Sequence, residues 1–401
     1  MRLTHCTFTP YRLPLRQPWA SARGGFAVRE GWLVRLVTDA GLAGYGDCAP
    51  LPQAGTENMD SAAACLSGWA ATLPGLTLEV ALGRIAASLS PGSLPAGCPH
   101  LNPLPQAGEE ANVKGACLDL RDEVSLREFY VNAAGAPAAC CGLETALLDL
   151  LAQQAGLPLA RWLNPRSAAA VKANAVLGGL DQPVVERALA AVAEGYSVLK
   201  LKVGLAAGHE EIPLLHDLAR CLPAGVSLRL DANCAWNEKE AEDFLGALAG
   251  LPVESVEDPL ASPDRAGWFR LQAEVPFPLA ADESLRIMGA DMVFSQPPVR
   301  RVVLKPMVLG GLVPALALAR RAREADVECV VTTTVDSAVG VTAALHLAAV
   351  VANDLAHGLA TSAWLLRDVG GAPLVDRGVL RLGGGPGLGC CPVTGEKIFF
   401  S

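Results

Sequence analysis

The sequence predicts an α/β protein whose main domain is a TIM-like (β/α) barrel, preceded by a smaller α+β domain. From about residue 138 onward, short apolar runs of strand length alternate with helical segments. Five of the runs end in a charged residue, and these residues recur every 23 to 29 positions, about one strand, one helix and two loops. They are Lys202, Asp231, Glu257, Asp282 and Lys305. In (β/α) barrels the catalytic groups lie at the carboxyl ends of the strands, so this spacing also predicts an active site.

The composition is that of a globular enzyme. The chain has 401 residues, of which 51% are hydrophobic and 18% charged, and this length favours two domains. The net charge of −9 argues against nucleic acids and anionic membranes as partners. No apolar run reaches membrane-spanning length, and the first residues lack the apolar stretch of a secretory signal, so a cytoplasmic protein is expected. The 12 scattered cysteines lack zinc-site spacing and are expected to be reduced thiols.

We expect the capping domain to cover residues 1–137. Its first part contains strand-like segments with a hairpin turn at 39–41, followed by helical periodicity over 59–89 that is interrupted near 74–75. Residues 90–115 are dense in proline and glycine, and they repeat the sequence PLPQAG that also occurs at 50–55. We interpret this segment as an inserted, disordered loop without a catalytic role.

The barrel domain is expected to cover residues 138–375. It begins with a helix that ends at Gly156, and the following strands alternate strictly with helices, which implies a right-handed parallel barrel. The expected strands are 171–177, 197–202, 227–231, 253–257, 278–282, 301–305, 328–333 and a weak eighth at 356–359. The expected helices are 184–195, 209–221, 238–249, 265–274, 285–291, 312–325 and 339–351. Residues 376–401 are loop-like and are expected to return to the capping domain.

The charged strand ends have the chemistry of a metal site. Lys200 and Lys202 are two residues apart and therefore face the same way along their strand. Two buried ammonium groups require carboxylates opposite them, and three neighbouring strands supply these. A set of carboxylate oxygens favours Mg²⁺, with Mn²⁺ as an alternative, over zinc.

The lysines are expected to carry the proton chemistry. A divalent ion stabilises the enediolate that forms when a proton is removed next to a carboxylate. Lys202 on the second strand and Lys305 on the sixth would lie on opposite walls of the barrel and flank a small-molecule carboxylate substrate. The same pattern places Arg229 and Asn233 beside Asp231, as groups that support the site.

Structural interpretations compete with the functional ones. Asp231 and Asn233 could serve as helix caps. Spacing alone does not decide whether Glu257 or Asp258 is the ligand, nor whether Asp282 or Glu283 is, and the second member of each pair could be a supporting or capping residue. His346 lies in an apolar helix and is expected to be a core residue, whereas His357 could line the site.

The motifs that carry these residues resemble the enolase superfamily, in particular its muconate-lactonizing subgroup. KLK at 200–202 resembles the subgroup's Lys-x-Lys motif, and DAN at 231–233, VEDP at 256–259 and ADES at 281–284 resemble its three ligand motifs. The resemblance covers nearly the whole chain except 90–115. It implies an enolase-type barrel under an α+β cap, with Asp231, Glu257 and Asp282 as ligands and Glu283 as a supporting residue.

Within the subgroup, four motifs look most like the o-succinylbenzoate synthases. These are GDCAPLP (46–52), LKPMVLGG (304–311), TTTVDSAVG (332–340) and AHGLATS (356–362). The resemblance implies a lyase of menaquinone biosynthesis that removes water in a syn elimination from 2-succinyl-6-hydroxy-2,4-cyclohexadiene-1-carboxylate. Lys202 would abstract the α-proton and return it to the departing hydroxide, Lys305 would stabilise the enediolate, and Lys200 would assist the substrate carboxylate.

The alternative is an isomerase that uses the same two lysines: an N-acylamino acid racemase, a dipeptide epimerase or a muconate-type cycloisomerase. No Asp-x-Asp motif occurs near the eighth strand, which speaks against a dipeptide epimerase. Ala360 stands where the synthases often have Asp, which is a departure from that family. Substrate contacts are expected from a glycine-rich loop that could close as a lid, from a second capping loop and from the loop after strand seven. The candidate residues are Arg23, Pro50, Thr332, Thr333 and Ser337. The sequence leaves the oligomeric state unassigned.

Overall fold

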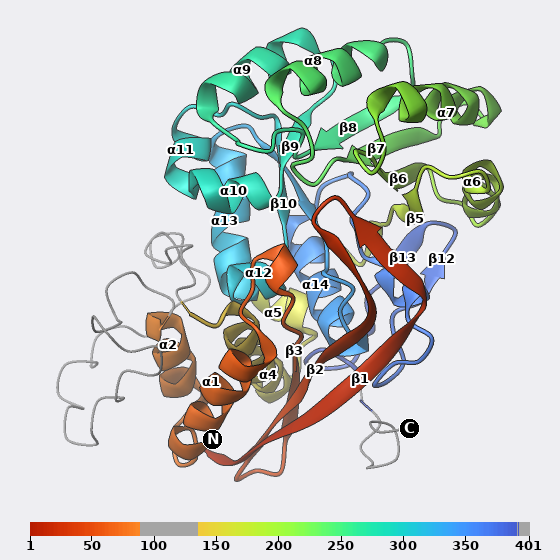
Figure 1. The fold of residues 1–401 in the computed structure, drawn as a ribbon. Coiled ribbons are helices and arrows are strands. Elements are labelled where there is room, and N and C mark those ends of the chain that lie inside the picture. Colours follow the sequence, from red (N-terminus) through yellow and green to blue (C-terminus); the bar gives the residue numbers. More distant parts are fainter. Residues whose placement is uncertain (89–134, 391, 393–401) are drawn as a thin grey trace.

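The computed structural model describes residues 1–88, 135–390 and 392. Two sheets dominate them: an antiparallel sheet near the N-terminus and a parallel sheet that curves into an incomplete barrel with helices outside it (Figure 1). This is the predicted fold class, an enolase-type barrel with an N-terminal cap. The expected insertion at 90–115 lies outside the described residues.

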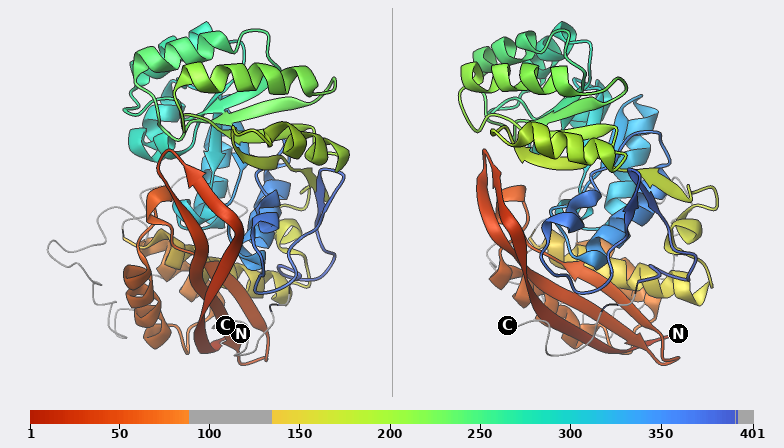
Figure 2. Two further views of the ribbon diagram at one scale, coloured as in Figure 1. Left: turned by 45° about the vertical axis from the view of Figure 1, so that its right-hand side comes forward. Right: turned by 90° about the vertical axis from the view of Figure 1, so that its right-hand side faces the viewer.

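The cap is built on a long β-hairpin. Strands β1 (Leu3–Ser21), β2 (Gly24–Thr38) and β3 (Ala43–Cys48) pair antiparallel in that order. Helices α1 (Met59–Thr72) and α2 (Leu78–Ser88) follow a short 3-10 turn at Pro52–Ala54, with the interruption where it was predicted. The tip of the hairpin, at residues 21–24, reaches toward the open end of the barrel (Figure 2).

The cap is joined to the barrel domain through helix α4 (Pro137–Gln154). The helix is buried along almost its whole length, and it packs against β3. Gly46 makes this approach feasible, because a Cβ at that position would overlap the Gly142 carbonyl group. Glu57, at the end of a capping loop, accepts hydrogen bonds from the Ala138 and Ala139 amides and so caps α4.

The parallel sheet has seven strands in the order β11-β10-β9-β8-β7-β6-β5. Their interiors are rich in Val, Leu and Ala, as expected for strands that are covered on both faces. The strands are β5 (Ala175–Gly179), β6 (Val198–Lys202), β7 (Ser227–Asp231), β8 (Val253–Glu257), β9 (Leu279–Ala281), β10 (Arg301–Leu304) and β11 (Glu328–Val331). The helices of this domain after α4 are α5 (Leu159–Leu163), α6 (Val184–Ala193), α7 (Gly208–Cys221), α8 (Glu238–Ala247), α9 (Arg265–Glu274), α10 (Glu283–Met288), α11 (Ala290–Ser295), α12 (Pro306–Leu309), α13 (Leu312–Glu324) and α14 (Ala338–Val351).

Two of the predicted strands were wrong in detail. The first, expected at 171–177, is divided into β4 (Ala170–Lys172), which joins a separate small sheet, and β5. The eighth, expected at 356–359, forms no strand: isolated bridges from His357 to Ala173 and from Gly358 to Thr332 take its place. The physical reason is that residues 352–358 turn directly between neighbours, and a 3-10 helix at Ala360–Trp364 follows at once.

The described part of the C-terminal segment lies against the barrel domain. Strands β12 (Val375–Asp376) and β13 (Val379–Arg381) pair with β4, and the Leu388 amide donates to Asp149 on α4. In the described residues no helix is long and apolar enough to cross a membrane. Cys6, Cys48, Cys65, Cys140, Cys141, Cys221, Cys234 and Cys329 are free thiols.

His346 is a core residue, as predicted. It is 1% exposed within α14, where its Nδ1 accepts from the Ala160 amide and its Nε2 contacts the Leu388 carbonyl oxygen. Burial lowers the pKa of His346 from 6.5 to about 4. The imidazole is therefore neutral in the folded protein at neutral pH.

This burial predicts a pH-dependent stability that depends on His346. Between pH 7 and pH 5 the unfolded chain binds a proton at this residue and the folded chain does not, so the free energy of unfolding falls by about 2 kcal/mol. Urea unfolding at both pH values should show this loss in the wild type and a smaller loss in His346→Gln. Equal losses in the two proteins would contradict the prediction.

Candidate active site

All five residues that close the apolar runs lie at one end of the parallel sheet. Lys202, Asp231 and Glu257 end strands β6, β7 and β8, whereas Asp282 and Lys305 directly follow β9 and β10. The strands are neighbours, and Lys202, Asp231 and Glu257 stand in register with one another. Each side chain is buried or nearly so, which separates the site from bulk water.

The three carboxylates form a compact ligand set. One oxygen each from Asp231, Glu257 and Asp282 lies within 4.8 Å of the others. The Lys200 ammonium already contacts the first two: it is 2.8 Å from Asp231 Oδ2, and it bonds to Glu257 Oε2. Oxygens that accept a buried ammonium group between them are suited to a cation, and an all-oxygen set suits Mg²⁺ or Mn²⁺.

The electrostatic balance also favours a divalent cation. Five carboxylates and three lysines gather here, which leaves two negative charges in excess when all are ionised. The carboxylates are those of Asp231, Glu257, Asp258, Asp282 and Glu283, and the lysines are Lys200, Lys202 and Lys305. Burial, followed by the charge of Glu283, raises the pKa of Asp282 to about 7. One divalent ion would remove the excess that makes ionisation of Asp282 costly.

Lys202 and Lys305 flank the carboxylates from the two sides. Lys202 Nζ donates to Asp231 Oδ2 and to Asn233 Oδ1, both at 2.7 Å. Lys305 Nζ donates to Asp282 Oδ2 at 2.5 Å, and it is 3.5 Å from Glu283 Oε1. Three strands, β7, β8 and β9, separate β6 from β10. The two ammonium groups are thus placed for opposite sides of a molecule bound over the carboxylates.

The third lysine is held as a cation. Burial acts to lower the pKa of Lys200, but the nearby charges of Asp231, Glu257 and Asp282 raise it overall. Burial likewise acts against ionisation of Asp231, and the contacts with Lys200 and Lys202 outweigh it, so the pKa of Asp231 is lowered. Lys200 is therefore suited to electrostatic work, not to removing a proton.

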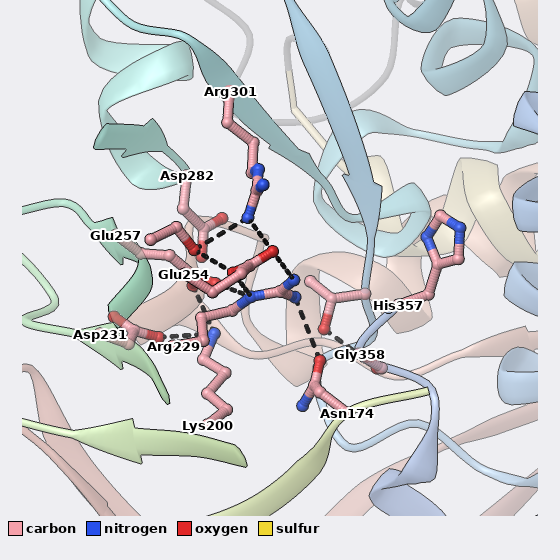
Figure 3. A network of polar contacts seen from close by, with 12 residues as sticks. Asn174, Lys200, Arg229, Asp231, Glu254, Glu257, Asp282, Arg301, His357 and Gly358 are labelled. Carbon is pink, nitrogen blue, oxygen red and sulfur yellow. Dashed lines mark hydrogen bonds and ion pairs between the residues drawn. The ribbon is translucent and has the colours of Figure 1, made fainter. Parts of the chain in front are cut away.

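A second polar layer lies beneath the carboxylates (Figure 3). Arg229 donates two hydrogen bonds of 3.1 Å to Glu254, and its Nε is 4.0 Å from Glu257 Oε1. Arg301 donates to Glu254 from the other side and also to Glu328. Burial acts to raise the pKa of Glu254, but the two guanidinium groups lower it to about 2. Arg229 thus connects this second polar layer to Glu257, a residue of the carboxylate set.

Removing one arginine from this layer should destabilise the protein strongly. Arg229→Met leaves the half-buried Glu254 with Arg301 as its remaining guanidinium partner, and losing hydrogen bonds to a charged group costs about 1.5–3 kcal/mol each. Chemical denaturation should detect the change. In the control, Arg220→Met, the arginine is 75% exposed beside Asp217 on α7, and its loss should cost about 0–1 kcal/mol. Similar losses in the free energy of unfolding for both variants would contradict the proposed contribution of this second polar layer to stability.

A cavity of about 570 Å³ opens beside the site, between the hairpin tip of the cap and three loops of the barrel. Its lining residues are Ser21, Ala22, Arg23, Gly204, Leu205, Asn233, Cys234, Ala235 and Ala261. Above the Lys202 ammonium, 5.5 Å away, lies the ring of Trp19, which stacks with Phe26 and packs edge-on against Trp364. The cap thus covers one side of the site with aromatic surface.

The predicted substrate-binding residues have different surroundings. Arg23 lines the cavity and donates to the Gln53 carbonyl oxygen. Pro50 is buried, and its carbonyl accepts from Arg29, which also binds Val335 of the barrel. The other three use their polar groups within the barrel domain and at its contact with the cap: Thr332 donates to Gly358, Thr333 bonds to Thr361, and the Ser337 amide donates to Asp47. Substrate contact at all five positions stays a prediction.

His357 does not offer a free base. It is fully buried, and its Nδ1 accepts from the Val331 amide. Burial, with the charge of Arg229 next, lowers the pKa of His357 to about 3. The imidazole is therefore neutral.

Sequence reasoning missed several residues around the site. Glu254 and Arg301 stand at the starts of strands, away from the strand ends that guided the search, although two charges within apolar strands were a usable signal. Trp19, Trp364 and Cys234 come from three distant segments. Only the fold brings these together.

Comparisons with known proteins agree with this geometry. A family model described as enolase C-terminal domain-like matches residues 183–393. The hydrophobic dipeptide epimerase of Enterococcus faecalis is 28% identical over 94% of this chain and 96% of its own. The L-Ala-D/L-Glu epimerase of Bacillus subtilis is 26% identical over 99% and 100%, and the N-succinyl-L-Arg/Lys racemase of Bacillus cereus is 24% identical over 87% and 84%.

Solved structures show the same fold. The E. faecalis dipeptide epimerase, in complex with Mg and the dipeptide L-Leu-L-Tyr, superimposes with a TM-score of 0.79 at 25% identity, covering 97% of this chain and 99% of its own. The muconate lactonizing enzyme of Pseudomonas fluorescens also reaches 0.79, at 22% identity over 98% and 97%. The three relatives are epimerases and a racemase by name. They therefore support the isomerase alternative over the synthase that the sequence motifs favoured.

Proposed function

This chain belongs to the enolase C-terminal domain-like family, and on that premise we propose that it is a racemase or epimerase of an amino-acid derivative with a free carboxylate. The observation that carries the proposal is the pair Lys202 and Lys305 on either side of three buried carboxylates. Inverting a carbon centre requires proton removal on one face and delivery on the other, and two opposed lysines fit that requirement. The names of the relatives support the same reaction class.

The proton steps follow from the two lysines. In one direction, neutral Lys202 accepts the α-proton from its face while the Lys305 ammonium donates a proton to the opposite face. In the reverse direction the roles exchange. Lys200 keeps its proton because three carboxylates surround it, and it supplies a fixed positive charge to the substrate carboxylate. The aromatic cover at Trp19 limits access of water to Lys202.

Asp231, Glu257 and Asp282 would hold a divalent cation, Mg²⁺ or Mn²⁺. When bound, such a cation supplies positive charge that stabilises the carboxylate side of the deprotonated substrate. With their oxygens on a cation, Asp231 and Asp282 would also attract the ammonium groups of Lys202 and Lys305 less strongly. This matters because, after the opposing effect of burial, Asp282 and Glu283 raise the pKa of Lys305 strongly.

The nitrogen of the substrate is proposed to be acylated. A free dipeptide ammonium group needs a carboxylate partner in a buried site. The segment 356–362, where the eighth strand was expected, contains no Asp or Glu. An N-acyl amino acid needs no such partner, and Arg23 in the cavity suits an acyl group that ends in a carboxylate, such as succinyl.

Proton exchange in D₂O tests this proposal. N-succinyl and N-acetyl amino acids, with dipeptides for comparison, are incubated with the enzyme and Mg²⁺. Loss of the α-proton signal in NMR, with formation of the opposite configuration, is expected for the N-acyl compounds and should stop with a chelator. Exchange without inversion, or no exchange with any member of the panel, would refute a racemase.

The second candidate is the o-succinylbenzoate synthase reaction. Its specific support is the segment AHGLATS at 356–362, which lacks the acidic pair of a dipeptide epimerase, together with the motif GDCAPLP at 46–52. The same Lys202 would remove the α-proton and return it to the departing hydroxide. Turnover of the succinyl-hydroxycyclohexadiene carboxylate changes its ultraviolet absorbance as the ring becomes aromatic. Efficient turnover without exchange of N-acyl amino acids would move the assignment to this lyase.

A further inference from the structure

A second group of possible ligands lies on the loops that follow the same three strands, one to three residues beyond the carboxylate set. It consists of Cys234, Asp258 and Glu283, whose thiol and carboxylate ligand atoms lie within 4.8 Å of one another. Asp258 directly follows Glu257, and Glu283 directly follows Asp282. The two groups are therefore adjacent but share no residue.

One carboxylate oxygen of this group, Glu283 Oε2, has no hydrogen-bond donor among the described residues. Asp258 is fully buried and accepts 3.2 Å hydrogen bonds from the Asp282 and Ser284 amides. The Glu283 side chain is 8% exposed: its Oε1 is 3.5 Å from Lys305, but its Oε2 is buried without a donor among the described residues. The Asp258 carboxylate is its neighbour within the ligand group. Two ionised carboxylates cannot bond to each other, so a proton or a cation has to lie between them.

Cys234 makes this a site for a particular class of cation. Its thiol is brought toward the carboxylates by a left-handed backbone conformation, with φ of 61°, and Asp258 has a φ of 43°. Cys234 also lines the 570 Å³ cavity, which gives an ion a route from solvent. A thiolate with two carboxylates favours thiophilic divalent ions such as Zn²⁺, whereas Mg²⁺ avoids sulfur.

We propose that Cys234, Asp258 and Glu283 form a second metal site, selective for a thiophilic divalent cation such as Zn²⁺. Binding releases the thiol proton to solvent and forms a bond between the metal and the Cys234 sulfur. The ion then lies at the wall of the cavity next to Asn233, on the side from which Arg23 approaches. Occupation of this site would narrow the cavity and inhibit the enzyme even when the magnesium-type site is filled.

Cobalt gives a direct test that does not depend on catalytic activity. The full-length protein is titrated with Co²⁺ in excess Mg²⁺, and the thiolate-to-cobalt charge-transfer band in the near ultraviolet is recorded. The band is expected in the wild type and in the control Cys221→Ser, whose thiol is exposed on α7, and it should be absent from Cys234→Ser. Zn²⁺ should displace Co²⁺ and bleach the band.

The affinity for Zn²⁺ measures how much the Cys234 sulfur contributes to metal binding. Loss of an outer partner of a metal ligand weakens binding about 10–100-fold, so loss of the sulfur ligand in Cys234→Ser should weaken Zn²⁺ binding by at least about 10-fold. No band in the wild type, or an equal band in Cys234→Ser, would overturn the proposal and leave a proton between Asp258 and Glu283. A band that fades as Mg²⁺ rises would show that Mg²⁺ and Co²⁺ compete, and would overturn a separate site selective for thiophilic ions. The racemase assignment is unaffected by any of these results.

Discussion

Replacing Lys202 by alanine is expected to slow α-proton exchange by about 10²–10⁴-fold, the range typical for loss of a general base or acid. The substitution removes a buried ammonium group that bonds to Asp231 and Asn233, whereas Lys200 continues to compensate Asp231. The fold and metal binding should therefore survive. Exchange rates measured separately from each enantiomer of the substrate test the expectation.

The two lysines should differ in the enantiomer that they serve. In a racemase, the loss of rate in Lys202→Ala should fall on exchange that starts from one enantiomer, and the loss in Lys305→Ala on exchange that starts from the other. Lys239→Ala, an exposed lysine on α8, is the matched control and should leave both rates unchanged. If the Lys202 variant retains exchange from both enantiomers, Lys202 is not the base.

Glu257→Gln is expected to weaken Mn²⁺ binding by at least about 10–100-fold, since losing even an outer partner of a metal ligand has that cost. Glu257 is 1% exposed, and its strand β8 lies between the strands that end at Asp231 and Asp282, so it is the central member of the carboxylate set. Mn²⁺ affinity from electron paramagnetic resonance measures the effect directly. Catalytic activity should fall with metal occupancy.

Glu254→Gln is the matched control because Glu254 lies on the same strand, three residues earlier. It binds Arg229 and Arg301 and contributes no oxygen to the carboxylate set. This variant should lose stability but keep its Mn²⁺ affinity. Equal Mn²⁺ affinity in the wild type and Glu257→Gln would remove Glu257 from the ligand set.

The sequence allowed the carboxylate set to be predicted because its spacing is tied to the barrel repeat. A charged residue at the end of each buried strand has one geometric outcome when the strands are parallel, and the structure brings Lys202, Asp231, Glu257, Asp282 and Lys305 together accordingly. The weak eighth strand was harder to predict from the sequence. Residues 356–359 form a single bridge to each neighbour, and strand-like composition does not distinguish such bridges from a strand.

The surroundings of the site could not be predicted for a different reason. The contact between Trp19 and Lys202, and the place of Arg23 in the cavity, depend on how the cap hairpin leans over the barrel. No periodicity in the chain encodes that angle. The reaction class was also underdetermined, since dehydration and racemisation begin with the same proton abstraction and use the same residues.

The bridges at His357 and Gly358 lie where the barrel is not closed by a continuous strand, between the edge strands β5 and β11. Strands β7, β8 and β9, whose ends carry the three carboxylates, pair with one another, whereas in the described residues β5 and β11 do not pair directly, and isolated bridges from His357 to Ala173 and from Gly358 to Thr332 lie between them. The two bridging residues are themselves constrained, because His357 is fully buried and accepts from the Val331 amide, and a Cβ at Gly358 would overlap the Thr332 side chain. The carboxylates and the bridges thus depend on different strands, so closure of the barrel and the spacing of the charged groups are separate properties of this fold.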